Sequence, residues 1–174
     1  MSKEGNETIQ KQNSKLERYR VWIFQGNQSR YDVYNSLLDE NVTEAAWLVS
    51  RFKEEIREGD VGLVWKAGQR SGIYAVGKVI SNPQMMYDLK ESRNYWRYES
   101  DRNQSLLRIK LHYKLRLRLT NAILKTELQK TPGLRKLEIF KQPIGTNFRV
   151  KPEEWQAILK LLKTRFDFKE SGLL

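Results

Sequence analysis

Two tryptophans and nearby small residues form a pattern suited to holding a flat ligand. Trp47 and Trp65 lie on either side of a turn-rich stretch, and Ala67 and Gly68 follow directly after Trp65. Large rings beside small residues leave room for a planar group to stack on the rings. The alternative is a core role, because Trp is usually buried and Trp65 shares one face of its strand with Leu63.

Gly26 and Asn27 end an aromatic and β-branched run at residues 19–24. A glycine at the end of a strand lets the backbone approach a ligand closely. The amide of Asn27 carries donors and an acceptor, which is the equipment needed to pair with the edge of a base. The alternative is a turn residue that hydrogen-bonds its own backbone.

The stretch from residue 81 to 105 combines aromatic rings with polar and basic residues. Its centre is Asn94-Tyr95-Trp96-Arg97-Tyr98. Aromatic side chains interleaved with basic ones are suited to stacking on nucleobases. Such rings could equally fold back over the core, and the sequence leaves both interpretations open.

The stretch from residue 107 to 119 alternates without a break between apolar residues and basic residues or His112. Alternation with a period of two predicts a long strand with one buried and one solvated face. A row of positive charges on such a face suits a phosphate backbone, although charge can also protect a sheet edge from pairing. The basic residues expected to contact phosphates are Arg97, Arg108, Lys110, Lys114 and Arg116.

The net charge supports a polyanionic partner. The 174-residue chain carries 32 Lys and Arg against 21 Asp and Glu, a net charge of +11, with an isoelectric point near 9.8. Residues 1–87 contribute 12 − 11 = +1 and residues 88–174 contribute 20 − 10 = +10. A basic surface of this kind is typical of nucleic-acid binding, the alternative being a merely soluble surface.

The sequence lacks the residues and motifs that several classes of protein function require. The chain has no Cys and one His, so disulfides, thiol chemistry and Cys- or His-rich metal sites are excluded. It has no phosphate-binding glycine motif, and its adjacent acid pairs, such as Glu54-Glu55, do not face each other on a helix. We therefore expect neither an enzyme nor a cofactor. No apolar run is long enough to span a membrane and no signal core is present, which predicts a cytoplasmic protein.

Local patterns predict the elements that position these residues. Strands are expected at residues 19–24, 61–66, 73–80, 107–119 and 134–140, and helices at residues 31–38, 50–56 and 122–130 and after Lys151. In the last helix Trp155, Ile158, Leu159 and Leu162 form an apolar stripe, so Trp155 is expected in the core. The chain is divided into a flexible arm (1–18), one domain (19–168) and a loose tail (169–174).

A series of motifs resembles the EVE domain, a relative of the YTH and PUA domains. The motifs are Trp22-Ile23-Phe24-Gln25-Gly26-Asn27, the stretch from Trp47 to Asp60, Trp65-Lys66-Ala67-Gly68, Gly72-Ile73-Tyr74-Ala75-Val76-Gly77 and Gly145-Thr146-Asn147-Phe148. They span roughly residues 19–164. The resemblance implies an α+β fold, a PUA-like twisted β-barrel of about five to six strands flanked by short helices.

The resemblance also implies an aromatic pocket for a modified, flipped base. The residues expected to form it are Trp22, Gly26, Asn27, Trp47, Trp65, Ala67, Gly68, Tyr74, Trp96, Thr146 and Asn147. Methylated adenine and methylated or hydroxymethylated cytosine both fit such a pocket. The expected partner is modified DNA, with RNA as the alternative. If the chain is the specificity module of a modification-dependent restriction system, a nuclease or NTPase is expected as a partner chain or as a fused domain. The alternative is a non-catalytic sensor of a small heterocycle, or a protein-interaction adaptor.

Overall fold

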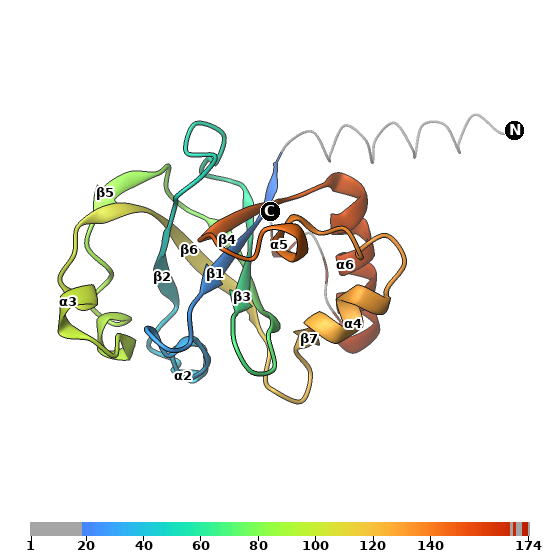
Figure 1. Ribbon diagram of the computed structural model, residues 1–174, viewed down its shortest axis with the longest axis horizontal. Helices are drawn as coiled ribbons and strands as arrows, with labels where there is room; N and C mark the ends of the chain where they lie inside the picture. Colours follow the sequence, from blue (N-terminus) through green and yellow to red (C-terminus); the bar gives the residue numbers. More distant parts are fainter. Residues whose placement is uncertain (1–18, 168, 170–171, 174) are drawn as a thin grey trace, which may run out of the picture.

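One strongly curled mixed sheet forms the centre of the molecule (Figure 1). The computed structural model describes residues 19–167, 169, 172 and 173. Its strands are β1 (Val21–Gly26), β2 (Glu44–Leu48), β3 (Val61–Lys66), β4 (Gly72–Val79), β5 (Gln84–Met86), β6 (Leu106–Arg116), β7 (Ile123–Leu124) and β8 (Asn147–Val150). Its helices are α2 (Val33–Leu38), the 3₁₀ helix η1 (Arg93–Tyr95), α3 (Glu99–Arg102), α4 (Lys125–Lys130), α5 (Glu138–Lys141) and α6 (Pro152–Arg165).

The strand order is β2-β6-β4-β3-β1-β8, with β5 added to β6 and β7 added to β4. The pair β1–β3 is parallel and the other pairs are antiparallel. The predicted α+β, PUA-like barrel with flanking helices is confirmed, with eight strands in place of five to six. The extra strands include the short β5 and β7, which carry too few residues to show a periodic pattern.

The two ends of the sheet are linked by side chains. The Asn147 side-chain oxygen, at the start of β8, accepts hydrogen bonds from the backbone N–H groups of Ser50 and Arg51, just after β2, at 3.0 and 3.1 Å. The Asn147 amide nitrogen donates to the Arg51 carbonyl at 2.6 Å. These hydrogen bonds close the barrel at the seam between its two edge strands, β2 and β8, which are not paired with each other.

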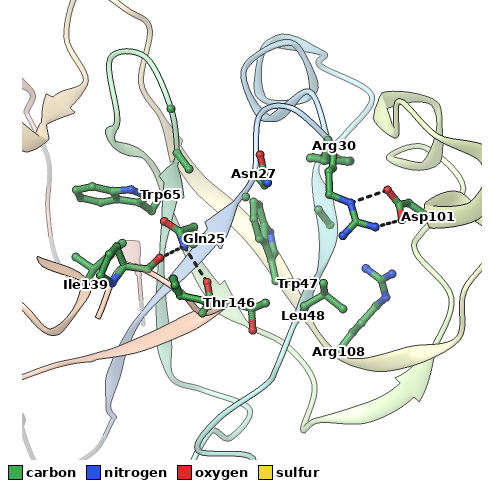
Figure 2. Close-up of a pocket in the computed structure, with 18 of the residues that line it drawn as sticks. Gln25, Asn27, Arg30, Trp47, Leu48, Trp65, Asp101, Arg108, Ile139 and Thr146 are labelled. Carbon is green, nitrogen blue, oxygen red and sulfur yellow. Dashed lines mark hydrogen bonds and ion pairs between the residues drawn. The ribbon is translucent and has the colours of Figure 1, made fainter. Parts of the chain in front are cut away.

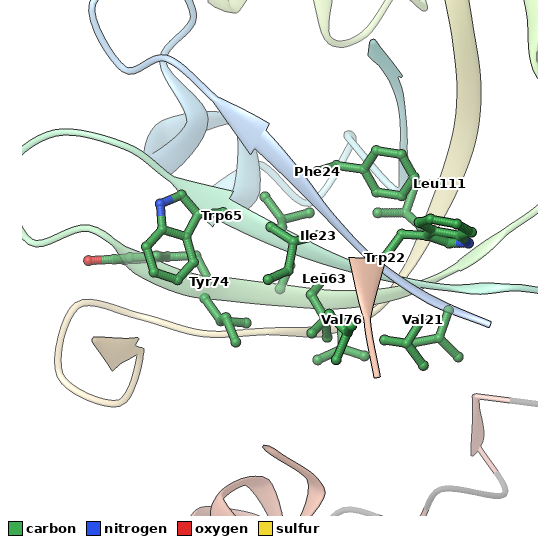
Figure 3. Close-up of a cluster of buried hydrophobic side chains, with 14 of the residues drawn as sticks. Val21, Trp22, Ile23, Phe24, Leu63, Trp65, Tyr74, Val76 and Leu111 are labelled. Carbon is green, nitrogen blue, oxygen red and sulfur yellow. The ribbon is translucent and has the colours of Figure 1, made fainter. Parts of the chain in front are cut away.

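The core fills the inside of the curled sheet and the space under α6 (Figure 3). Trp22, Ile23 and Phe24 on β1 are all fully buried, because a strand between two neighbours with both faces covered needs apolar residues at successive positions. Trp155 is also fully buried on α6, as its helical spacing predicts. Its indole N–H donates to the Tyr19 hydroxyl at 3.1 Å.

Two predicted elements are wrong. Residues 50–56 form turns in place of a helix, because Phe52 adopts a left-handed φ of 60° that cannot continue a right-handed helix. Its ring instead packs on Trp22 with centroids 5.4 Å apart. Residues 134–140 form turns and the start of α5 in place of a strand, and the buried Leu134 and Leu137 have the three-residue spacing of a helical turn.

Other elements agree with the prediction apart from their ends. The region predicted as helix at 122–130 begins as β7 and becomes α4, and α2 begins at Val33. The predicted arm, residues 1–18, lies outside the described residues. Of the predicted tail, residues 169, 172 and 173 are described, and Leu173 is fully buried.

The regular alternation along β6 conceals a β-bulge. Tyr113 pairs with Gly77 on β4 and Leu115 pairs with Val76, so Lys114 is an extra residue without a pairing partner on β4. A Cβ at Gly77 would lie 2.5 Å from the His112 carbonyl oxygen, so this close crossing requires glycine. A bulge changes the direction of the side chains that follow it in the strand. Arg116 is one of those side chains.

Candidate functional site

A cavity of about 680 Å³ lies at the seam of the barrel, bordered by the end of β1, by β2 and by the loop before β8 (Figure 2). This volume is in the range typical of small-ligand sites. The residues that line it include Gln25, Gly26, Asn27, Ala46, Trp47, Leu48, Ala67, Gly68, Phe140, Ile144 and Thr146. Trp65 lies toward one end, and Asp101 and Arg108 lie toward the other. Trp96 also lines the cavity, beside Arg108.

Trp47 lies in the middle of the cavity wall. Its side chain is 6% exposed, its indole N–H donates to the Tyr113 hydroxyl at 3.2 Å, and its ring meets the Tyr31 ring edge-on. A Cβ on Gly26 would come within 3.2 Å of the Trp47 ring and 2.3 Å of Val33. Glycine is therefore needed for β1 to pass close to the indole, and the indole is held rigidly in a wall position.

Two further tryptophans mark the ends of the cavity. Trp65 on β3 is 3% exposed, and Phe140 of α5 meets its ring at 6.0 Å and 67°. Trp96, after η1, donates its indole N–H to Asp88 at 2.6 Å and packs on Tyr31 with centroids 5.0 Å apart. The rings supply stacking surface, and their partners fix each ring before a ligand arrives.

The loop before β8 is fixed to β1 by one side chain. The amide nitrogen of Gln25 donates to the carbonyl oxygens of Pro143 at 2.9 Å and Gly145 at 2.8 Å. These bonds hold the backbone on both sides of Ile144. The Ile144 side chain, at the rim of the cavity, is 94% exposed.

The opposite end of the cavity contains a buried cation. Arg108 on β6 is 1% exposed, and its guanidinium group lies 5.6 Å from the centre of the Trp96 ring. Burial lowers the pKa of Arg108, and the nearby charge of Asp88 acts in the opposite direction. Beside it, the Arg30 guanidinium group forms a two-bond ion pair with the buried carboxylate of Asp101. Charges of both signs therefore border this end.

Asn27 forms the turn that was one of its two expected roles, and it lies at the cavity, where the other role stays a prediction. Its side-chain oxygen accepts from the N–H of Ser29 at 3.0 Å and from the Ser29 hydroxyl at 2.7 Å, which is the pattern of an Asx-turn. Asn27 also lines the cavity. Its amide nitrogen is therefore the part of the side chain that is suited to contact a ligand.

Comparison with known proteins identifies the family. The family model described as the EVE domain matches residues 20–161. The chain belongs to the EVE domain family. A search of curated proteins finds no match.

Solved structures with this fold come from bacteria and eukaryotes. A protein from Leishmania major is similar with a TM-score of 0.59 at 16% identity, covering 86% of this chain and 98% of its own. A protein from Rhodopseudomonas palustris has a TM-score of 0.59 at 13% identity, with coverage of 87% and 99%. The human THYN1 protein, solved in complex with DNA containing 5-methylcytosine, has a TM-score of 0.57 at 14% identity, with coverage of 82% and 96%. At these identities the likeness establishes the fold.

Most residues expected in the pocket of this EVE domain come together around the cavity. Those that line it are Gly26, Asn27, Trp47, Trp65, Ala67, Gly68, Trp96 and Thr146. They come from five separate parts of the chain, and the closure of the barrel unites them. What each contributes to binding stays a prediction.

Three expected pocket residues lie elsewhere. Trp22 is fully buried in the core and donates its indole N–H to Asp60 at 2.7 Å. Tyr74 is also fully buried, and its hydroxyl donates to the Arg70 carbonyl at 2.7 Å. Asn147 holds the segment after β2, as described above. All three are absent from the cavity wall, because their motifs stabilise the barrel beside the cavity.

The expectation of a uniformly solvated basic face on β6 is also corrected. Arg108 is buried in the cavity because the segment from β5 to α3 covers this end of the strand. Arg116, after the bulge, lies against the Tyr113 ring and donates to the carbonyls of Asp39 at 2.8 Å and Val42 at 2.7 Å. Of the remaining expected phosphate contacts, Lys114 is exposed, Lys110 is half-buried, and Arg97 is partly exposed and paired with Asp32 and Gln28.

Sequence reasoning missed several cavity residues of this EVE domain. Arg30 and Asp101 are 71 positions apart and pair only in the folded chain. Gln25 and Ile144 gave no periodic or compositional signal, although Gln25 lies inside a family motif. Among the described residues, no cluster of three or more His, Asp or Glu side chains could hold a metal ion, and no helix is long and apolar enough to cross a membrane.

Proposed function

We propose that this EVE domain is a nucleic-acid reader that holds a modified base, flipped out of its stack, in the cavity at the barrel seam. The observation that carries this proposal is the cavity itself, which presents three pre-positioned indoles together with buried polar groups. Stacking on aromatic rings contributes about 1–3 kcal/mol per base. That term accepts any base, so the polar groups must supply most of the selectivity.

The chemistry of the cavity favours binding over catalysis. Arg30 is paired with Asp101, and Trp96 is hydrogen-bonded to Asp88. The donors and acceptors of these side chains therefore hold the cavity wall in place. The human THYN1 protein was solved in complex with DNA containing 5-methylcytosine, which supports nucleic acid as the ligand of the present EVE domain. A role beside a nuclease or NTPase in a restriction system, RNA as the ligand, and a cytoplasmic location stay predictions.

The proposal is tested by a binding screen at fixed salt. Oligonucleotides would carry one cytosine, 5-methylcytosine, 5-hydroxymethylcytosine, adenine or N6-methyladenine, in DNA and RNA and in single- and double-stranded form. We expect one modified base to bind more tightly than its unmodified parent. Equal affinity for every oligonucleotide, or none, would contradict the proposal and favour a sensor of a free heterocycle, which the same assay would examine with free nucleobases.

Three basic side chains at the surface, two exposed and one half-buried, are expected to provide affinity without selectivity. Changing Arg97, Lys110 or Lys114 singly to Gln should weaken binding of modified and plain DNA alike, since phosphate contacts carry no sequence information. Each true contact should reduce the slope of log K against log salt by about 0.7–0.9. Lys160→Gln, an exposed site on α6, is the control, and wild-type slopes in every variant would assign these residues to solubility.

Ile144 is expected to assist base flipping in duplex DNA. An apolar side chain that is 94% exposed on a fixed loop at the cavity rim is placed to fill the gap left by the flipped base. Ile144→Ala should weaken binding to a modified duplex by about 1–2 kcal/mol, the value of the apolar surface that it buries. Binding to the single strand should not change, because no gap exists there.

The control for Ile144 is Met85→Ala, which removes another exposed apolar side chain on β5. If Ile144→Ala weakened single- and double-stranded binding equally, the side chain would contact the ligand in the cavity and take no part in flipping.

A further inference from the structure

Arg108 is a buried cation whose hydrogen-bonding capacity is largely unused. Among the described residues it donates one hydrogen bond, from Nη1 to the Ala46 carbonyl, and this bond is long at 3.5 Å. Nε and Nη2 are buried without a partner within the part of the chain that the structure describes. A guanidinium group carries five N–H donors, and buried polar groups are normally satisfied. The unused donors indicate that a ligand completes this site.

The neighbouring carboxylates are already engaged by other groups. Asp88 accepts from the Trp96 indole at 2.6 Å, from the Ser92 hydroxyl at 2.7 Å and from the N–H of Leu89 at 2.8 Å. Asp101 is paired with Arg30. Since both acids hold other partners, Arg108 is fixed beside negative charge without being neutralised by a direct contact.

The depth of Arg108 limits what can reach it. A phosphodiester group continues into the backbone in both directions and suits an open surface, whereas Arg108 is only 1% exposed. The edge of a flipped base enters a cavity end-on and can reach such a buried donor. A base edge therefore fits the position of Arg108 better than a phosphodiester does.

We propose that Arg108 reads the O2 and N3 atoms of a flipped cytosine derivative, which rests on the proposed function of this EVE domain. The guanidinium fork pairs best with two adjacent acceptors in one plane. Cytosine offers O2 and N3 side by side. Adenine has no adjacent acceptor pair on its Watson–Crick or Hoogsteen edge, and thymine places an N–H donor between its two carbonyl oxygens.

The opposite end of the cavity fits the opposite side of the same ring. In cytosine the C5 atom lies directly across the ring from C2, which carries O2. With O2 directed at Arg108, a substituent on C5 points past Trp47 toward the end bordered by Trp65 and Phe140. Guanine also has adjacent acceptors, O6 and N7, but with these at Arg108 its polar N2 and N3 edge would meet the rings.

The test compares single-stranded oligonucleotides that differ at one base. Thymine and 5-methylcytosine share the C5 methyl group and O2. They differ at N3, which carries a hydrogen in thymine, and at C4, which carries an oxygen in place of the amino group. 3-Methylcytosine blocks N3 directly, so its comparison with cytosine examines the N3 contact separately from the C4 group. We expect 5-methylcytosine to bind about 5- to 150-fold more tightly than thymine, the discrimination typical of a bidentate pair. 3-Methylcytosine should bind more weakly than unmodified cytosine by a similar factor. These arms use the unmodified protein and do not depend on how any variant folds.

Arg108→Met, which keeps an unbranched side chain and removes the guanidinium donors, should reduce the preference for 5-methylcytosine over thymine to within about threefold. Its affinity for thymine and its salt slope should stay as in the wild type. Arg118→Met, which removes a charge from an exposed position, is the matched control and should keep the full preference.

Three outcomes would overturn the role of Arg108. The first is equal binding of thymine and 5-methylcytosine by the wild type. The second is tighter binding of N6-methyladenine or guanine than of 5-methylcytosine. The third is an equal loss of affinity for all oligonucleotides in Arg108→Met, with a salt slope lower by about 0.7–0.9, which would indicate a phosphate contact. After either of the first two outcomes the protein could still bind a flipped base, but with a different specificity. Failure of every oligonucleotide to bind would refute the proposed function itself.

Discussion

Replacing Trp47 by alanine is expected to weaken binding of the preferred modified oligonucleotide by about 1–3 kcal/mol, the contribution of one stacking ring. Trp47 lies at the middle of the cavity wall, and Tyr113, Tyr31 and Gly26 hold its ring in place. Without the indole a flipped base would lose this face of the cavity. Preference for the modified base should fall as well, because the base would no longer be held in one orientation.

Trp47 is also 6% exposed, so its truncation should destabilise the fold by about 3–5 kcal/mol. The two effects are separated with Trp47→Phe, which keeps an aromatic ring and removes the N–H that donates to Tyr113. Trp155→Phe is the matched control, since its indole donates to a tyrosine hydroxyl in the same manner but lies outside the cavity. Urea unfolding measures stability and titration with oligonucleotides measures binding. Unchanged selectivity in folded Trp47→Ala would assign Trp47 to the core.

Replacing Asp60 by alanine is expected to lower the free energy of unfolding by about 3–5 kcal/mol, because hydrogen bonds to a charged acceptor contribute about 1.5–3 kcal/mol each and several donors would lose their partner. Asp60 is 5% exposed and accepts three hydrogen bonds. They come from the Trp22 indole at 2.7 Å and from the backbone N–H groups of Arg20 at 2.9 Å and Arg57 at 3.0 Å. Without the carboxylate these donors would stay buried and unsatisfied.

Urea unfolding of Asp60→Ala beside Glu58→Ala would check this expectation. Glu58 is exposed in the same turn, so its truncation should change stability by less than about 0.5 kcal/mol. Asp60→Asn should fall between the two, because one amide oxygen can replace only part of the carboxylate. If Asp60→Ala were as stable as Glu58→Ala, the Trp22 indole would have to find another acceptor, and Asp60 would not be the group that joins β1 to the start of β3.

Local periodicity was sufficient to predict much of the scaffold. The strand at 61–66 matches β3, and the strand at 107–119 matches most of β6. Trp155 was correctly predicted to lie in the core. These features follow from side-chain spacing along one segment, which repeats every two residues in a strand and about every 3.6 in a helix. The motifs that resemble the EVE domain led to the correct family.

The sequence by itself therefore determined the family and the main strands. It singled out Trp47, Trp65 and Trp96, which line the cavity, but also Trp22 and Tyr74, which do not. Only the tertiary structure decided which basic residues face solvent. Arg108 and Lys114 occupy equivalent positions in the alternating pattern, yet the folded segment from β5 to α3 buries the first, whereas the second lies at a bulge and is exposed. Likewise, Gln25 and Pro143 meet across 118 positions to form the rim. Periodicity reports which side of its own strand a residue occupies, but what covers that side depends on contacts between distant segments.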